Sequence, residues 1–222
     1  MAVPPHRPSS PPAIHPADRL AEAVSRVGSP VCVGLDPVLE RLPEILKPAH
    51  AADAPAALER FCEEVLEAIV GQVGVVKIQS ACFERYGAPG MAALARTLAA
   101  ARRRDLVTIL DAKRGDIGIS AGHYAAAADS LNADWITING YLGEDGILPF
   151  LDSALGCFVL VRTSNPSGAT VQQQVLADGR TVAESMADLV ESLGEGRLGQ
   201  HGYSRLGAVV GATHPGELEG FR

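Results

Sequence analysis

The chain has 222 residues, of which 47% are apolar, and its 19 basic and 26 acidic side chains give a formal net charge of −7. This length is enough for one large domain with a sizeable core. The excess of acidic residues argues against electrostatic binding of nucleic-acid polymers, because such binding needs a basic face. No apolar run approaches the roughly 18–20 residues of a membrane span.

Residues 1–16 contain six prolines and few apolar side chains. They cannot bury an apolar face, so we predict a disordered tail at 1–16 and a single domain at 17–222. The four cysteines occur singly, without a C-x-x-C pair, as Cys32, Cys62, Cys82 and Cys157. We interpret them as small buried hydrophobic residues in a reducing compartment, which predicts a cytoplasmic protein.

Short apolar runs rich in β-branched residues predict buried strands, and longer stretches with apolar residues at helical spacing predict helices. In chain order we predict a strand at 31–36, a helix at 53–70, a strand at 73–79, a helix at 91–101, a strand at 106–113, a helix at 120–131, strands at 134–139 and 157–162, a helix at 181–193 and a strand at 206–212. This alternation indicates a parallel sheet covered by helices.

A doubly wound sheet and a (β/α)₈ barrel both fit this alternation, and the polar residues at the strand ends distinguish them. Five of the six predicted strands end in, or run into, polar residues: Asp36, Lys77 with Gln79, Asp111 with Lys113, Asn139, and Arg162 before the run at 163–165. Polar side chains gathered from the C-terminal ends of many strands are typical of a barrel, whereas a doubly wound sheet concentrates its site at one switch point. We therefore predict a TIM (β/α)₈ barrel, of which about six strand–helix units are present.

One motif imitates a nucleotide-binding site. The sequence GEGRLG at 194–199 matches the dinucleotide fingerprint G-x-G-x-x-G. That fingerprint requires a preceding strand and a following helix, and here the predicted order is reversed. We interpret it as a helix-to-strand loop.

The strongest chemical signal is the sequence DAKRGDIG at 111–118. Because strand side chains alternate between faces, Asp111 and Lys113 point the same way and Arg114 points away from them. The two glycines of the motif let the backbone turn and leave Asp116 on the loop over the barrel mouth. A second lysine, Lys77, lies within another strand, where a buried charge needs a partner; Asp111 is available if the two strands are neighbours.

Asp36, at the end of the first strand, reaches the same mouth. Carboxylates beside a lysine raise the pKa of its ammonium group and keep it protonated. Such a group can stabilise a developing carbanion and donate a proton to it, while a carboxylate beside a substrate carboxylate favours loss of CO₂. These residues predict a decarboxylation that needs no cofactor or metal. A Schiff-base aldolase, whose lysine needs apolar surroundings, and ordinary salt bridges at strand ends are the alternatives.

The chain resembles the orotidine 5′-phosphate decarboxylase family, particularly its bacterial subgroup with the DAKRGDIG signature. The resemblance runs from about residue 31 to the last residue. It is carried by GLDP at 34–37, VVKIQ at 75–79, DAKRGDIG at 111–118, TINGYLG at 137–143, TSNPSG at 163–168 and VVGAT at 209–213. It implies the conversion of orotidine 5′-monophosphate to uridine 5′-monophosphate, the last step of de novo pyrimidine biosynthesis.

The resemblance implies catalytic roles for four residues. Lys113 is similar to the family's proton donor to C6 of the pyrimidine, and Asp111 to the carboxylate placed against the departing CO₂ group. Lys77 is similar to the lysine that bridges this aspartate and the ribose. Asp116 resembles the aspartate that reaches into the neighbouring subunit's site, so a homodimer with shared active sites is implied.

Three further residues resemble the family's substrate-binding groups. Asp36 matches an acceptor for a ribose hydroxyl, and Ser164 matches the serine that contacts the pyrimidine ring. Ser120 stands where the family often has threonine, which keeps the hydroxyl group. The chain also reads Asn-Gly-Tyr at 139–141, where relatives commonly have proline before the tyrosine, and we expect this change to loosen a loop without removing chemistry.

The family continues with two more strand–helix units, which hold the substrate phosphate, and no candidate for that phosphate site occurs before residue 222. We therefore expect a truncated chain that is poorly active or unstable alone. Two other functions remain open: a magnesium-dependent sugar-phosphate decarboxylase or aldolase of the same barrel superfamily, and a non-catalytic barrel fragment.

Overall fold

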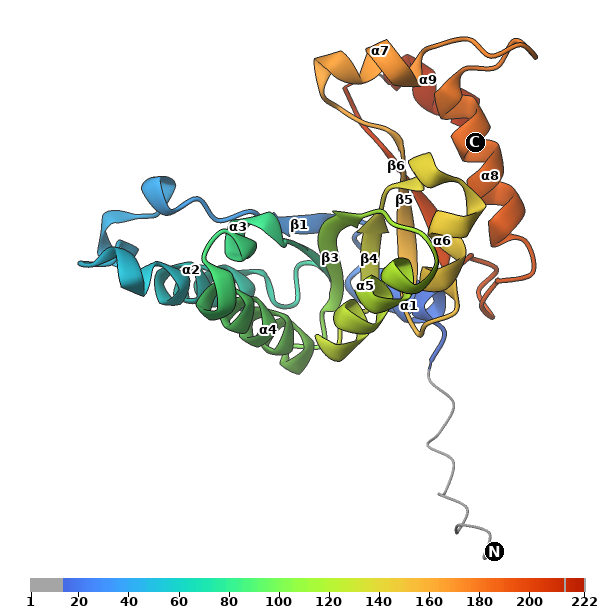
Figure 1. Ribbon diagram of the computed structural model, residues 1–222. Helices are drawn as coiled ribbons and strands as arrows, with labels where there is room; N and C mark the ends of the chain where they lie inside the picture. Colours follow the sequence, from blue (N-terminus) through green and yellow to red (C-terminus); the bar gives the residue numbers. More distant parts are fainter. Residues whose placement is uncertain (1–13, 214, 222) are drawn as a thin grey trace, which may run out of the picture.

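Six parallel strands form one curled sheet with helices on its outer face (Figure 1). The computed structural model describes residues 14–213 and 215–221. The strands are β1 (Cys32–Leu35), β2 (Val75–Gln79), β3 (Val107–Arg114), β4 (Trp135–Ile138), β5 (Gly156–Arg162) and β6 (Leu206–Val210). All six predicted strands are confirmed, with ends that differ by at most two residues. Most of the predicted tail, residues 1–13, lies outside the described residues.

The sheet order settles the fold class. The strands pair in the order β1-β2-β3-β4-β5-β6, so that each strand lies beside the next one along the chain. A doubly wound sheet reverses its strand order at a switch point, whereas a barrel adds its strands in sequence. The predicted barrel class is therefore confirmed. Within the described residues, β1 and β6 are the edges of the sheet and each pairs with one neighbour only.

Nine helices accompany the strands in the described part of the chain. They are α1 (Pro16–Val27), α2 (Ala54–Ile69), α3 (Ala81–Glu84), α4 (Gly87–Arg103), α5 (Gly118–Ser130), α6 (Glu144–Leu151), α7 (Ala169–Gln172), α8 (Val182–Gly194) and α9 (Pro215–Leu218). Short 3₁₀ helices are η1 (Leu39–Arg41), η2 (Glu44–Leu46), η3 (Ala51–Asp53), η4 (Gly140–Leu142), η5 (Pro166–Gly168) and η6 (Glu219–Phe221). The four predicted helices correspond to α2, α4, α5 and α8. None of the described helices is long and apolar enough to cross a membrane.

Alternation along the strands divides the core in two. The outward side chains of the sheet, such as Val76 and Ile78, are fully buried against the surrounding helices. The inward side chains near the N-terminal ends of the strands form a second cluster, in which Val75, Val107 and Trp135 pack against α1. The Trp135 ring stacks on Phe158 with 4.5 Å between ring centroids. Helix α1 thus closes the N-terminal end of the sheet.

A buried carboxylate ties α1 to the loop before β6. Asp18 is 5% exposed, and its two oxygens accept the backbone N–H groups of Gln200 and His201 at 3.0 Å each. A Cβ atom at Gly199 would lie 2.3 Å from this carboxylate, so the turn needs glycine there. The N-terminal helix and the last loop of the sheet therefore form one unit.

Two predictions about single motifs have different outcomes. The sequence at 194–199 follows α8 and precedes β6, so its assignment as a helix-to-strand loop is confirmed. All four cysteines are free thiols, as predicted. However, only Cys62 and Cys157 are buried, and Cys32 is exposed because it lies on edge strand β1. The prediction of uniformly buried cysteines is therefore wrong.

Candidate active site

Three neighbouring strands bring four charged side chains together at their C-terminal ends. The Asp111 carboxylate lies 2.8 Å from Lys77 Nζ through Oδ2 and 2.6 Å from Lys113 Nζ through Oδ1. Lys77 Nζ also lies 3.4 Å from Asp36 Oδ1, and a Cβ atom at Gly34 would come within 2.8 Å of Asp36. The predicted pairing of Lys77 with Asp111 is confirmed, because β2 and β3 are adjacent.

Asp111 is the buried centre of this charged cluster, with 4% of its surface exposed. Burial by itself raises the pKa of its carboxyl group, but hydrogen bonds from Lys113, Lys77 and Thr137 outweigh it and hold the pKa below the usual value. Gln79 Nε2 adds a further donor at 3.2 Å. Asp111 is therefore held as a carboxylate.

Lys77 shows the complementary effect. Burial lowers the pKa of its ammonium group, but the hydrogen bond and charge of Asp111, with a contribution from Asp36, raise it above the usual value. A lysine held charged beside two carboxylates cannot serve as the neutral amine of a Schiff base. The cluster therefore favours a role in which Lys77 acts as a positive charge over one in which it forms an imine.

The backbone conformation at Lys113 is not that of a regular β-strand. Its backbone has a φ of +46°, and the register between β3 and β4 shifts between Leu110 and Arg114. Simple alternation gives the right face for Lys113, but the local backbone is a bulge and not a regular strand. The Lys113 N–H donates to Thr137 Oγ1 at 3.0 Å, and the Thr137 hydroxyl donates to Asp111 Oδ1 at 2.8 Å.

The remaining predicted residues lie around this cluster without a hydrogen bond or ion pair to it among the described residues. Asp116 follows β3, and its Oδ1 accepts the N–H of Ile117 at 2.9 Å. Ser120 is exposed on the first turns of α5. Ser164 is exposed on the loop after β5. The structure thus brings Asp36, Lys77, Asp111 and Lys113 together and leaves Asp116, Ser120 and Ser164 apart from them.

The loop that carries Ser164 has a buried support. Arg162 is 1% exposed, and its guanidinium donates to Glu217 Oε2 at 2.7 Å and to the carbonyl oxygen of Thr163 at 3.1 Å. Gln172 Oε1 accepts the Thr163 N–H at 3.0 Å, and Gln172 Nε2 donates to the Thr163 hydroxyl at 2.7 Å. These hydrogen bonds fix the backbone at Thr163, where the loop begins. Ser164 is the next residue, and its side chain is exposed.

Sequence reasoning missed two supporting residues, Thr137 and Ser80. The signal for Thr137 is a hydroxyl in phase with the inward Trp135 of an otherwise apolar strand, because such a group needs a polar partner. Ser80 donates its N–H to the Asp111 carbonyl oxygen at 3.1 Å. No sequence pattern marks a backbone donor, so this contact is visible only in the structure.

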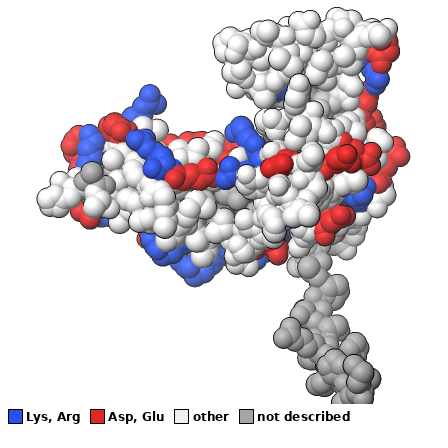
Figure 2. All heavy atoms as spheres, in the orientation of Figure 1, with Lys and Arg blue, Asp and Glu red and all other residues white. Residues whose placement is uncertain are grey.

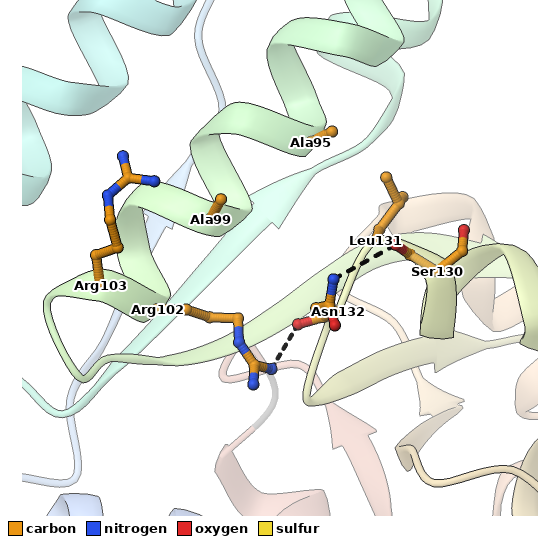
Figure 3. A pocket seen from close by; sticks show the side chains of 7 residues that line it. All are labelled: Ala95, Ala99, Arg102, Arg103, Ser130, Leu131 and Asn132. Atoms are coloured by element: carbon orange, nitrogen blue, oxygen red, sulfur yellow. Dashed lines mark hydrogen bonds between the residues drawn. The ribbon is translucent and has the colours of Figure 1, made fainter.

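The surface charge and the hollow between α4 and α5 do not point to a different site. In Figure 2, basic and acidic side chains are interspersed over the part that carries α2, β1 and α4, while the surface over α7 is largely uncharged. A hollow of about 380 Å³ lies between α4 and the end of α5 (Figure 3). Its Arg102 donates to the Asn132 carbonyl oxygen and to Asp134. The Arg102 guanidinium therefore already has hydrogen-bond partners within the protein.

The fold and the charged cluster together define an enzyme of the parallel β/α-barrel class with an Asp–Lys centre at the C-terminal ends of its strands. More specifically, the chain belongs to the Orotidine 5′-phosphate decarboxylase / HUMPS family, whose model matches residues 29–222. The resemblance inferred from the motifs is therefore confirmed.

Individual relatives agree with this assignment. The chain is 41% identical over 222 residues to the orotidine 5′-phosphate decarboxylase of Rhodopirellula baltica, which covers 93% of this chain and 73% of the relative. It is 41% identical over 203 residues to the enzyme of that name from Salinispora arenicola, with 88% and 70% covered. The solved structure of Leishmania donovani OMP decarboxylase has a TM-score of 0.77 at 33% identity and covers 94% of this chain and 75% of that one.

Proposed function

We propose that this protein catalyses the decarboxylation of orotidine 5′-monophosphate to uridine 5′-monophosphate without a cofactor. The observation that carries the proposal is the buried Asp111 carboxylate held between the ammonium groups of Lys77 and Lys113. Family membership and the names of the relatives support it.

In the proposed mechanism, the substrate carboxylate lies against Asp111, and repulsion between the two anions favours its departure. The bond between this carboxyl group and C6 breaks, CO₂ leaves, and the electron pair stays on C6. Lys113 then donates an ammonium proton to C6 and is reprotonated from solvent. Because Lys113 Nζ lies 2.6 Å from Asp111, the proton arrives from the side on which CO₂ departs.

Three residues are proposed to bind the nucleotide substrate. Asp36 is exposed and contacts Lys77, so it can accept a hydrogen bond from a ribose hydroxyl beside the charged cluster. Ser164 is proposed to contact the pyrimidine ring, and the hydrogen bonds of Thr163 that hold the start of its loop support this. Ser120 offers a further hydroxyl from α5.

We also propose a homodimer in which Asp116 serves the partner's site. Large apolar side chains are exposed next to Asp116 and on the neighbouring η4 segment: Ile117, Ile119, Tyr124, Tyr141 and Leu142, at 57%, 82%, 40%, 77% and 46%. Such a patch beside the barrel mouth is typical of a protein interface. The four free cysteines support a cytoplasmic location.

The decisive test is the decay of orotidine 5′-monophosphate absorbance, with and without EDTA. Turnover that EDTA does not change supports the proposal. Activity on a keto-sugar phosphate that EDTA abolishes would instead support the magnesium-dependent alternative, and no turnover of either substrate would favour a non-catalytic barrel.

The shared site is tested with hybrid dimers. Asp116→Ala and Lys113→Ala proteins are each expected to be inactive, and mixing them should restore part of the rate, because one site of each hybrid keeps both groups. Subunit exchange is monitored with differently tagged chains. Exchange without recovery of activity would contradict the shared site.

A further inference from the structure

Lys113 has an unusual backbone for a residue inside a strand. Three described non-glycine residues have positive φ: Asp105 (57°), Lys113 (46°) and Asn132 (54°). Asp105 and Asn132 lie in the turns before β3 and β4, where such values are common. Lys113 alone has this conformation within a strand, and a strained backbone persists only where its surroundings hold it.

One side of this bulge is held by β4. The Lys113 N–H donates to Thr137 Oγ1, and the Asn139 N–H donates to the Arg114 carbonyl oxygen at 2.7 Å. These contacts fix the backbone but do not determine which side chain enters the site.

The other side is held by an ion pair outside the site. The Arg114 guanidinium pairs with Glu84 of α3 and lies 5.4 Å from the ring centroid of Tyr124 on α5. The Ser80 hydroxyl donates to the same Glu84 carboxylate, and the Ser80 N–H donates to the Asp111 carbonyl oxygen. Asp111 and Arg114, on either side of Lys113, are therefore both anchored at the junction of β2 and α3.

The anchor matters because two cations are adjacent in the sequence. Successive side chains of a strand point to opposite faces, so a slip of one residue at the bulge would exchange Lys113 and Arg114. A guanidinium beside Asp111 would satisfy the carboxylate equally well. It could not donate a proton to the substrate, because arginine keeps its proton at all ordinary pH values.

We propose that Glu84 and Arg114 are positioning residues that hold Arg114 out of the site and so place Lys113, not Arg114, against Asp111. This proposal rests on the proposed function only for its catalytic consequence. The geometric part, that the ion pair sets the conformation of Lys113, can be tested on its own.

The kinetic test compares Glu84→Gln and Arg114→Gln with Glu59→Gln. Glu59 forms a bidentate ion pair with Arg96 between α2 and α4, at 2.7 Å for each contact, and provides a matched control. Glu84→Gln and Arg114→Gln are expected to lower kcat by about 10²-fold, the cost of a misplacement of about 1 Å. Their KM should change little. The control should keep both constants within about two-fold, since exposed ion pairs contribute little.

A structural readout separates positioning from turnover. The chain has three lysines, Lys47, Lys77 and Lys113, so ¹⁵N-lysine labelling gives three assignable backbone amide signals. In Glu84→Gln the Lys113 signal is expected to shift and its hydrogen exchange to speed up, while the Lys47 signal stays in place. The charge-swapped double variant Glu84→Arg/Arg114→Glu should return both the signal and kcat toward wild type.

An unmoved Lys113 signal in Glu84→Gln, or a kcat no lower than that of Glu59→Gln in an active enzyme, would overturn the positioning role. If the wild-type chain has no decarboxylase activity but the Lys113 signal responds as expected, the proposed function fails and the positioning role stands.

Discussion

The two ends of the sheet's inner face differ in chemistry although the same strands build both. At the N-terminal end, Val75, Val107 and Trp135 pack against α1 and form an apolar layer. Two to four residues further along β2 and β3, Lys77 and Asp111 occupy the same face. Strands that are apolar at one end and charged at the other separate the part that stabilises the barrel from the part that carries the proposed active site.

This separation also explains how the charged cluster can be partly buried. A buried charge is costly, and the cluster offsets that cost with ion pairs and with donors from Thr137 and Gln79. The side chains of the apolar layer carry no charge, so they can be buried without ion pairs or hydrogen-bond donors. Changes at the charged end should therefore alter catalysis more than folding, and changes at the apolar end should do the reverse.

The largest expected effect is at Lys113. Lys113→Ala removes the proposed proton donor and should lower kcat by about 10²–10⁴-fold, the usual contribution of general acid catalysis. The thermal unfolding midpoint should change little, because the lysine side chain is 47% exposed. Lys47→Ala, at the exposed lysine paired with Glu44, is the control and should keep full activity. A Lys113→Ala protein that retains turnover would remove Lys113 from the mechanism.

The opposite outcome is expected at Trp135. Trp135→Ala leaves a cavity beside Phe158 and should lower the free energy of unfolding by about 3–5 kcal/mol, measured by urea denaturation. Tyr203→Ala, at a 64% exposed aromatic residue, should change it by less than about 0.5 kcal/mol. The KM and kcat of the folded Trp135→Ala protein should stay close to wild type. A large loss of kcat there would show that the two ends are not separate.

Asp111 should link the charged end to stability through pH. Its carboxyl pKa is lower in the folded chain than the unfolded value of 3.8, so its stabilising contribution is present above about pH 3.8 and is lost as pH falls through the folded pKa. Asp111→Asn should reduce the free energy of unfolding by about 1–3 kcal/mol at neutral pH. The difference from wild type should shrink below pH 3.8, as measured by denaturant titrations at several pH values.

Asp105→Asn, at a carboxylate that is 71% exposed, serves as the control for this pH dependence. A wild-type and Asp111→Asn difference that is constant down to pH 2 would mean that the stability of the cluster does not depend on the Asp111 charge. Lys77 should show the opposite dependence of stability on pH. Its raised pKa predicts a contribution that is present below pH 10.5 and is lost as pH rises through the folded pKa.

The smallest expected effect is at the bond between α1 and the last loop. Asp18→Asn keeps one acceptor but loses the charge, and should cost about 1 kcal/mol of unfolding free energy with unchanged kcat. Glu22→Gln changes a nearby exposed acid, 50% accessible, and is the control. Equal losses of unfolding free energy in the two variants would show that the buried hydrogen bonds of Asp18 add no stability beyond that of an exposed carboxylate.

Most of the sheet could be predicted from the sequence because its strands are runs of β-branched residues bounded by polar ones. The contact between Lys77 and Asp111 also followed, since both residues share a face and their strands are consecutive. Five of the nine described helices were not predicted: the four-residue α3, α7 and α9, and the longer α1 and α6. Helix α1 begins at the last proline of the proline-rich segment, and α6 contains Pro149, a residue that normally argues against a helix interior.

The conformation of Lys113 could not be predicted in the same way. Alternation along a strand assumes regular backbone, and the bulge depends on contacts with Thr137, Glu84 and Ser80 from other elements. The roles of Asp116 and Ser164 are beyond alternation as well, because both lie on loops. A strand pattern does not encode the conformation of a loop.

The bond between Asp18 and the turn at Gln200 also has a consequence for synthesis in the cell. The two residues are 182 positions apart. At ordinary translation rates, roughly ten to forty seconds pass between the synthesis of Asp18 and that of Gln200. Until then the apolar side of α1 and the inner face of the growing sheet are held by fewer contacts. The contact that joins α1 to the last loop therefore forms only after the first five strands of the sheet have been synthesised.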